Sequence, residues 1–356
     1  MYSRQLVDLP QSLVKNGKPV FGTFSGHISK LDIRGLRTPF GGFPLPSFIS
    51  NFRIKSSLTF NFKYGPFIAS VIFFDAKIYG IAEVSLWNEE TGRKYVYKSL
   101  MGPRRRFIPH NMEQGFCASF NKCRYIRVSW DHKRDRFSII FNLKGDSIRP
   151  SVQAAFTGHF SDSQTQEVTQ CVPIKSRRRC SASYLATLKI HGTISFEKTK
   201  TTQSCTFSEE QGEGLFFINR AYYGYITQNQ IIYAAGLQNG KQISFLLDNI
   251  SSNMPDPEFS NRNSLFYEGE YTPLPPVKMT QPFGLSKKWI IQDTENMVDL
   301  TFEPISNNFR DLSAFVTKLQ FNTIYGKFEG CFKTKDGKIV KISNFGGIAR
   351  DQLLRL

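Results

Sequence analysis

The chain has 356 residues, of which 40% are hydrophobic and 14% aromatic, so it is too long for one ordinary core and too apolar for wholesale disorder. Its formal net charge of +17, from 46 Lys and Arg against 29 Asp and Glu, is spread along the chain and indicates a basic surface that is mainly solvated. Contact with an anionic membrane surface is a second interpretation of this charge, and nucleic-acid binding is the least favoured one.

The beginning of the chain and its apolar segments predict the compartment. No apolar segment follows Met1–Gln5, so we expect no signal peptide. The longest apolar run, residues 67–74, is far too short to cross a membrane. The six cysteines include no C-x-x-C pair, which argues against a zinc knuckle or a thioredoxin-type redox site. We therefore expect a cytoplasmic protein whose cysteines are buried thiols.

Loops and alternating strands fill the first half. Residues 39–46 are rich in Pro and Gly and predict a loop that could cross the end of a barrel. Residues 81–87 and 94–100 predict two strands of a hairpin. Apolar and polar residues alternate again in 126–130 and 137–141, which is typical of strands with one face on a core.

The same pattern continues to the end of the chain. The dipeptides Asn239-Gly240 and Asp336-Gly337 each separate two alternating runs and predict tight type I′ hairpins. Residues 298–303 form another alternating strand, and we expect at most a short helical turn, at 349–353. Many short strands joined by turns indicate an all-β fold.

A polar and then basic stretch at residues 161–180 is the preferred junction between two halves of similar strand content. We therefore predict two antiparallel β-barrels in tandem, an N-terminal barrel at 1–175 and a C-terminal barrel at 176–356.

Motifs in the C-terminal half carry a family resemblance. Residues 325–330, 334–339 and 344–349, which read YGKFEG, TKDGKI and NFGGIA, resemble the closing signature of the uncharacterised bacterial family catalogued as domain of unknown function 2804. The upstream segments KWI, at 288–290, and VDLTFEP, at 298–304, are also similar to that family. The resemblance implies the paired lipocalin-like barrels of carotenoid hydratases and tocopherol cyclases, without an activity that can be carried over.

The chain departs from the family pattern at two places. The family usually has Glu after its final Gly-aromatic-Ala, where this chain has Arg350. Its centre is rich in Trp, whereas residues 213–224 of this chain have Phe and Tyr instead. If those positions shape a shared pocket, the ligand or the chemistry has changed here.

The most suggestive candidate site is a strand in this aromatic centre. The candidate ligand-binding residues in it are Asn219, Arg220, Tyr222, Tyr223 and Tyr225. Alternation would turn Asn219, Tyr223 and Tyr225 to one face, with Arg220 and Tyr222 on the other. One face could line a cavity with aromatic walls and a few polar groups. The alternative is ordinary barrel packing with tyrosine hydroxyls that reach solvent.

A second candidate element is the segment 261–269, which is similar to an Asn-rich turn of the family. Its Asn263 and Glu268 could meet the previous strand at a barrel mouth. Ordinary turn chemistry is the favoured alternative, because Asn and Gly readily adopt the left-handed conformation.

No metal site or cofactor is expected. None of the five histidines has ligand spacing to another, so a metal site would have to be assembled in space. Asp293, Glu295 and Asp299 lie close together and could do acid–base chemistry, although turn and surface roles explain them as well. No hydrolase elbow, phosphate-binding loop, dinucleotide fingerprint or zinc-peptidase motif occurs. The five histidines are His27, His110, His132, His159 and His191.

Three functions stay open. The first is a lipocalin-like protein that binds a small hydrophobic or amphipathic ligand in a barrel cavity or between the barrels. The second is a cofactor-independent hydratase or cyclase acting on an isoprenoid or lipid, as the resemblance implies. The third is a basic protein that docks on an anionic membrane or nucleic acid.

Overall fold

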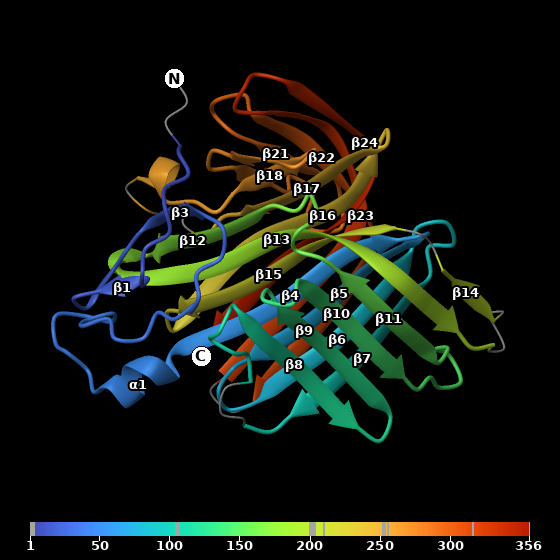
Figure 1. The fold of residues 1–356 in the computed structure, drawn as a ribbon, viewed down its shortest axis with the longest axis horizontal. Helices are drawn as coiled ribbons and strands as arrows, with labels where there is room; N and C mark the ends of the chain where they lie inside the picture. Colours follow the sequence, from blue (N-terminus) through green and yellow to red (C-terminus); the bar gives the residue numbers. More distant parts are fainter. Residues whose placement is uncertain are drawn as a thin grey trace.

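Two large antiparallel sheets make up almost the whole protein (Figure 1). The computed structural model describes residues 4–103, 107–198, 204–208, 211–250, 254, 256–314 and 317–355. Outside the two sheets lie the short hairpin of β1 (Val14–Lys15) and β2 (Lys18–Pro19), the helix α1 (Ser47–Phe52) and the 3-10 turn η1 (Pro257–Phe259). None of the helices described is long and apolar enough to span a membrane.

The first sheet is a nearly closed barrel. Its main path runs β7-β6-β5-β4-β15-β13-β11-β10-β9-β8, and the two end strands meet where the Asn121 amide donates a hydrogen bond of 3.1 Å to Ser99. The strands of this sheet are β3 (Gly22–Ser25), β4 (Ile54–Tyr64), β5 (Phe67–Asp75), β6 (Gly80–Asn88), β7 (Lys94–Met101), β8 (Gln114–Asn121), β9 (Arg124–Asp131), β10 (Arg136–Leu143), β11 (Val152–Gly158), β12 (Glu167–Ile174), β13 (Ser176–Phe196), β14 (Cys205–Phe207) and β15 (Gly212–Tyr222).

Side chains fill the interior of this barrel. Rings such as Phe60, Phe137 and Phe216 lie 5.0–6.5 Å apart at its centre, a spacing typical of packed aromatic cores. The loop predicted at residues 39–46 lies at the edge of this core, where the Phe40 ring packs edge-on against Tyr222. The barrel interior is therefore a packed core.

The second sheet is a half-barrel with the strand order β19-β18-β17-β16-β24-β23-β22-β21-β20. Its concave face buries a separate core around Phe245, Phe302 and Phe328. The strands are β16 (Ile226–Gln238), β17 (Lys241–Asp248), β18 (Ser264–Tyr267), β19 (Glu270–Pro273), β20 (Lys278–Thr280), β21 (Trp289–Gln292), β22 (Val298–Ala314), β23 (Thr317–Lys333) and β24 (Ile339–Arg355). The all-β fold with two lipocalin-like barrel units in tandem is confirmed.

Three local predictions need correction. The chain passes from the first sheet to the second between Tyr222 and Ile226, because β13 and β15 both pair within the first sheet. The predicted halves 1–175 and 176–356 therefore do not coincide with the two sheets. The expected helical turn at 349–353 is strand, since β24 pairs with β16 on one side and β23 on the other. The Asn239-Gly240 hairpin has both residues at positive φ, as type I′ requires, whereas at Asp336-Gly337 only Gly337 does.

Two positions of the closing signature require glycine because their surroundings leave no room for a side chain. Gly326 and Gly347 are paired directly across β23 and β24. A Cβ at Gly326 would lie 2.1 Å from the Glu303 carbonyl oxygen, and one at Gly347 would lie 2.6 Å from the Phe328 ring. These positions need glycine because neighbouring backbone and rings approach too closely for any side chain.

Candidate functional site

A polar cavity lies between the two sheets, outside the interior of the first barrel. Strands β4, β5, β6 and β15 form one wall, and β16, β22, β23 and β24 form the other. The open space is small, about 40 Å³, which is room for a few water molecules. The described residues that line it include three arginines and no acidic residue: Ser57, Thr59, Ile72, Phe74, Ile81, Phe217, Asn219, Tyr223, Asn229, Ile231, Tyr233, Arg262, Arg310, Phe321, Arg350 and Gln352.

Arg262 is the first of these arginines and connects the two sheets. Its Nε donates to Asp248 Oδ2 at 2.7 Å, and both side chains are almost completely buried. Its Nη1 donates across the sheet boundary to Ser181 Oγ at 3.0 Å and to Asn219 Oδ1 at 2.8 Å. The charge of Arg262 is therefore neutralised, and its position is fixed by four hydrogen bonds to three side chains when the second bond to Asp248 is included.

Arg310 and Arg350 lie side by side on the second sheet. Arg310 Nη2 is 2.9 Å from Glu83 Oε1 of the first sheet and donates to Thr323 Oγ1 at 2.8 Å. The Nε of Arg350 reaches the same hydroxyl at 3.4 Å. Burial raises the pKa of Glu83, despite the opposing effect of the nearby cations.

Arg350 is the least compensated of the three. Its side chain is buried, and its guanidinium stacks over the Tyr233 ring at 5.6 Å. Its Nη2 is buried without a hydrogen-bond partner, and none of the carboxylates described lies within ion-pair distance of it. Burial accordingly lowers the pKa of Arg350. A buried charge with a free donor costs free energy unless a ligand or ordered water completes it.

Two of the predicted residues line this cavity. Asn219 and Tyr223 share a face, as the alternation predicted, and the Asn219 amide donates to the Tyr223 hydroxyl at 3.2 Å. Asn219 Oδ1 also accepts a hydrogen bond of 2.6 Å from Ser181. Asn219 is thus held in place by residues of both sheets.

The other three residues of that candidate strand lie elsewhere. Arg220 and Tyr222 point to the opposite face, where Arg220 donates to Ser56 Oγ and to the carbonyl oxygen of Ile108 at the end of the first barrel. Tyr225 lies beyond the end of β15, half exposed, with Arg355 stacked on its ring. The prediction that Tyr225 shares the cavity face with Asn219 is wrong, because β15 ends at Tyr222 and only the next residue, Tyr223, still follows the alternation.

Asn263 and Glu268 both serve in local structure. Asn263 accepts a hydrogen bond from the Asp248 backbone N–H at 2.7 Å and donates to the Pro275 carbonyl at 2.7 Å. Asn263 therefore braces the chain beside Arg262 without lining the cavity. Glu268 is a turn residue at φ 49°, with ion pairs to Lys241 and Lys338.

Sequence reasoning missed the arginines and Glu83. For Glu83 the available signal was a single charged residue in the mainly apolar strand β6. Arg350 had a different signal, since it stands where the family pattern usually has Glu. Asp293, the first of the neighbouring acidic residues, lies in a turn. Its carboxylate accepts hydrogen bonds from the backbone N–H groups of Met297 and Val298.

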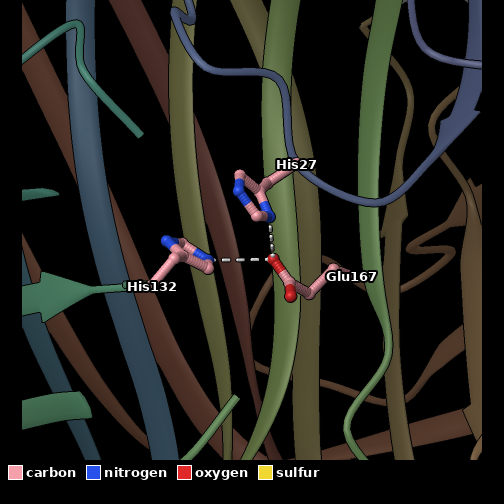
Figure 2. Close-up of side chains that lie close together, drawn as sticks. All are labelled: His27, His132 and Glu167. Carbon is pink, nitrogen blue, oxygen red and sulfur yellow. Dashed lines mark hydrogen bonds and ion pairs between the residues drawn. The ribbon is translucent and has the colours of Figure 1, made fainter. Parts of the chain in front are cut away.

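A second polar cluster, outside this cavity, corrects the expectation that the histidines stand apart (Figure 2). His27 Nδ1 lies 3.1 Å from Glu167 Oε2, and His132 Nε2 lies 3.0 Å from the same oxygen. The Tyr184 hydroxyl also donates to that oxygen at 2.6 Å. Burial alone would raise the pKa of Glu167, but these three hydrogen bonds lower it to about 2. The cluster has the donor types of a metal site.

Comparison with known proteins gives a family and a fold. The sequence pattern of a family described as a domain of unknown function, DUF2804, matches residues 4–356. No curated protein sequence matches the chain. Kievitone hydratase from Nectria haematococca is similar in structure, with a TM-score of 0.47 and 9% identity over 85% of this chain and 88% of that chain. CghA has a TM-score of 0.44 and 11% identity over the same shares of the two chains. Similarity at this level describes the fold and assigns no activity.

Proposed function

The chain belongs to the DUF2804 family, and for this member we propose that the cavity between the sheets binds a small amphipathic organic anion. The observation that carries the proposal is Arg350, a buried cation with a free Nη2 donor beside the cavity. A carboxylate or sulfonate group would accept this hydrogen bond and neutralise the charge.

The walls of the cavity suit the apolar part of such a ligand. Ile72, Phe74 and Ile81 line it on the first sheet, and Phe321 lines it on the second. Ligand pockets commonly combine such apolar walls with a few polar groups that fix orientation. Because the open space is about 40 Å³, it accommodates an anionic head group, and a larger apolar part would have to displace side chains of these walls.

Replacing Arg350 with methionine should separate binding from stability. We expect the affinity for 8-anilinonaphthalene-1-sulfonate, an anionic apolar dye, to fall about 10- to 100-fold. This decrease corresponds to the loss of one or two charge-assisted hydrogen bonds. The melting temperature should stay level or rise, because an uncompensated buried charge is replaced by an apolar side chain of similar length. Dye fluorescence and thermal melting measure the two effects.

Two controls make this experiment specific. N-phenyl-1-naphthylamine has the same aromatic body without the sulfonate, so its affinity should change less than about 3-fold in the Arg350 variant. Arg355→Met removes an exposed arginine from the end of the same strand and should leave dye binding unchanged. Equal loss of both dyes, or no loss of either, would contradict an anion site at Arg350.

Glu83 favours a second candidate function, an acid-catalysed hydratase or cyclase acting on an isoprenoid or lipid. Its carboxyl is completely buried beside Arg310, and burial raises its pKa above the usual value, which is the direction that a general acid requires. Such an acid could protonate an alkene, after which water or an internal hydroxyl would attack the resulting cation and return a proton to the Glu83 carboxylate.

This candidate has its own test. Farnesoic acid, an isoprenoid carboxylate, would be incubated with the protein in ¹⁸O-labelled water, and hydration would appear by mass spectrometry as incorporation of one labelled water. Glu83→Gln should reduce turnover by a factor of at least about 100 while it keeps anionic dye binding. Equal turnover by both proteins would exclude Glu83 as the acid, and no product from the wild type would reject this reaction for that substrate.

The third function, docking on an anionic membrane or nucleic acid, stays a prediction. The basic run at 104–106 lies outside the described residues. In the run at 177–179, Arg177 forms an ion pair of 2.6 Å with Asp256. Neither run adds support for a docking surface.

A further inference from the structure

We propose that His27, His132 and Glu167 form a binding site for one divalent first-row transition-metal ion, with zinc as the best match. The site lies on the first barrel unit and is independent of the anion cavity, since none of its residues lines that cavity. His27 follows β3, His132 follows β9, and Glu167 begins β12, so the fold brings together three separate segments.

The spacing of the donor atoms fits a small cation. The three ligand atoms lie within 4.8 Å of one another, and the two nitrogen atoms are 3.1 and 3.0 Å from Glu167 Oε2. Ligands at about 2.0–2.1 Å from a tetrahedral zinc ion are about 3.4 Å apart, and the two imidazoles would have to rotate out of their stacked arrangement to direct both nitrogen lone pairs at one ion. Two imidazoles and a carboxylate are the donor set of catalytic zinc sites that keep an open position.

The surroundings give the His27 ring a carboxylate partner, whereas Nδ1 of His132 is buried without a hydrogen-bond partner. His27 Nε2, the nitrogen that faces away from the cluster centre, lies 3.5 Å from Glu113 Oε1. A carboxylate behind a ligating imidazole fixes its tautomer and raises its basicity. The His132 ring packs between Phe160 at 4.0 Å and His27 at 3.9 Å, which keeps it beside Glu167.

The burial of the cluster leaves one side open. The His132 side chain is 6% exposed, whereas His27 is 25% exposed and Glu167 18% exposed. A metal ion could therefore enter from the His27 side, and water could occupy a fourth position there. The Tyr184 hydroxyl, which donates to Glu167, holds the carboxylate from the buried side.

The experiment uses the full chain, stripped with a chelator and titrated with CoCl₂ and then with ZnCl₂. We expect one cobalt ion per chain with visible absorption bands of a four- or five-coordinate nitrogen and oxygen site, and displacement of cobalt by an equivalent of zinc. His132→Ala should weaken zinc binding at least about 100-fold, and Glu113→Gln, which acts through His27, about 10-fold. Calorimetry measures both affinities.

Two further variants keep the test decisive. His159→Ala removes an exposed histidine that pairs with Asp135 and is not one of the three proposed ligands, so it should leave zinc affinity unchanged. His27→Gln, at the partly exposed position, provides a variant whose folding can be checked by circular dichroism if His132→Ala fails to fold. A thiolate-to-cobalt absorption band, equal binding by wild type and the His27 variant, or no binding by the wild type at millimolar metal would overturn the proposal.

Discussion

Replacing Asp248 with alanine should lower the free energy of unfolding by about 3–5 kcal/mol, because it leaves the Arg262 charge buried without its counterion. The two side chains are 1% and 2% exposed, so bulk water does not screen the charge that is left. The loss should reach beyond the second sheet, since Arg262 also donates to Ser181 and Asn219 of the first sheet. Urea unfolding, followed by tryptophan fluorescence, measures the effect.

The matched control for this prediction is an exposed carboxylate. Glu268 forms ion pairs with Lys241 and Lys338 at the surface, and its replacement by alanine should leave the free energy of unfolding almost unchanged. The double variant Asp248→Ala with Arg262→Met should recover much of the stability, because no charge then stays buried alone. If Asp248→Ala costs as little as Glu268→Ala, the Asp248–Arg262 pair does not stabilise the contact between the sheets.

Replacing Phe302 with alanine should also cost about 3–5 kcal/mol, the usual loss for a fully buried aromatic side chain. Phe302 stacks near Phe328 at 4.6 Å and against Trp289 at 5.7 Å in the core of the second sheet. Tyr223→Ala should cost roughly half as much, because it enlarges a polar cavity that water can enter. It should nevertheless abolish most binding of the anionic dye.

Thermal melting and dye fluorescence of the two variants distinguish the roles of these aromatic residues. Tyr223→Phe keeps the ring and removes only the hydroxyl that accepts the Asn219 hydrogen bond, so it should retain most of the stability. A Tyr223→Ala variant that melts as low as Phe302→Ala, with unchanged dye binding per folded molecule, would assign Tyr223 to packing alone.

Local sequence patterns determined most of the fold. Alternation at residues 126–130, 137–141 and 298–303 predicted strands that the structure contains, because side chains in a strand alternate between two faces whatever the tertiary context. The same rule placed Asn219 and Tyr223 together. It failed for Tyr225, since alternation holds only while the strand lasts.

Tertiary structure alone decided which charged residues meet. Glu83 and Arg310 are far apart in sequence and belong to different sheets, and no local pattern encodes their ion pair. His27 and Glu167 are 140 positions apart and become neighbours only through the pairing of β3 with β12. The sequence by itself determined the strands, many of their turns and one face of the candidate site. The cavity and the histidine cluster form only when the strands pair and the sheets pack. This packing brings together distant segments, and no local sequence pattern encodes the contacts between their side chains.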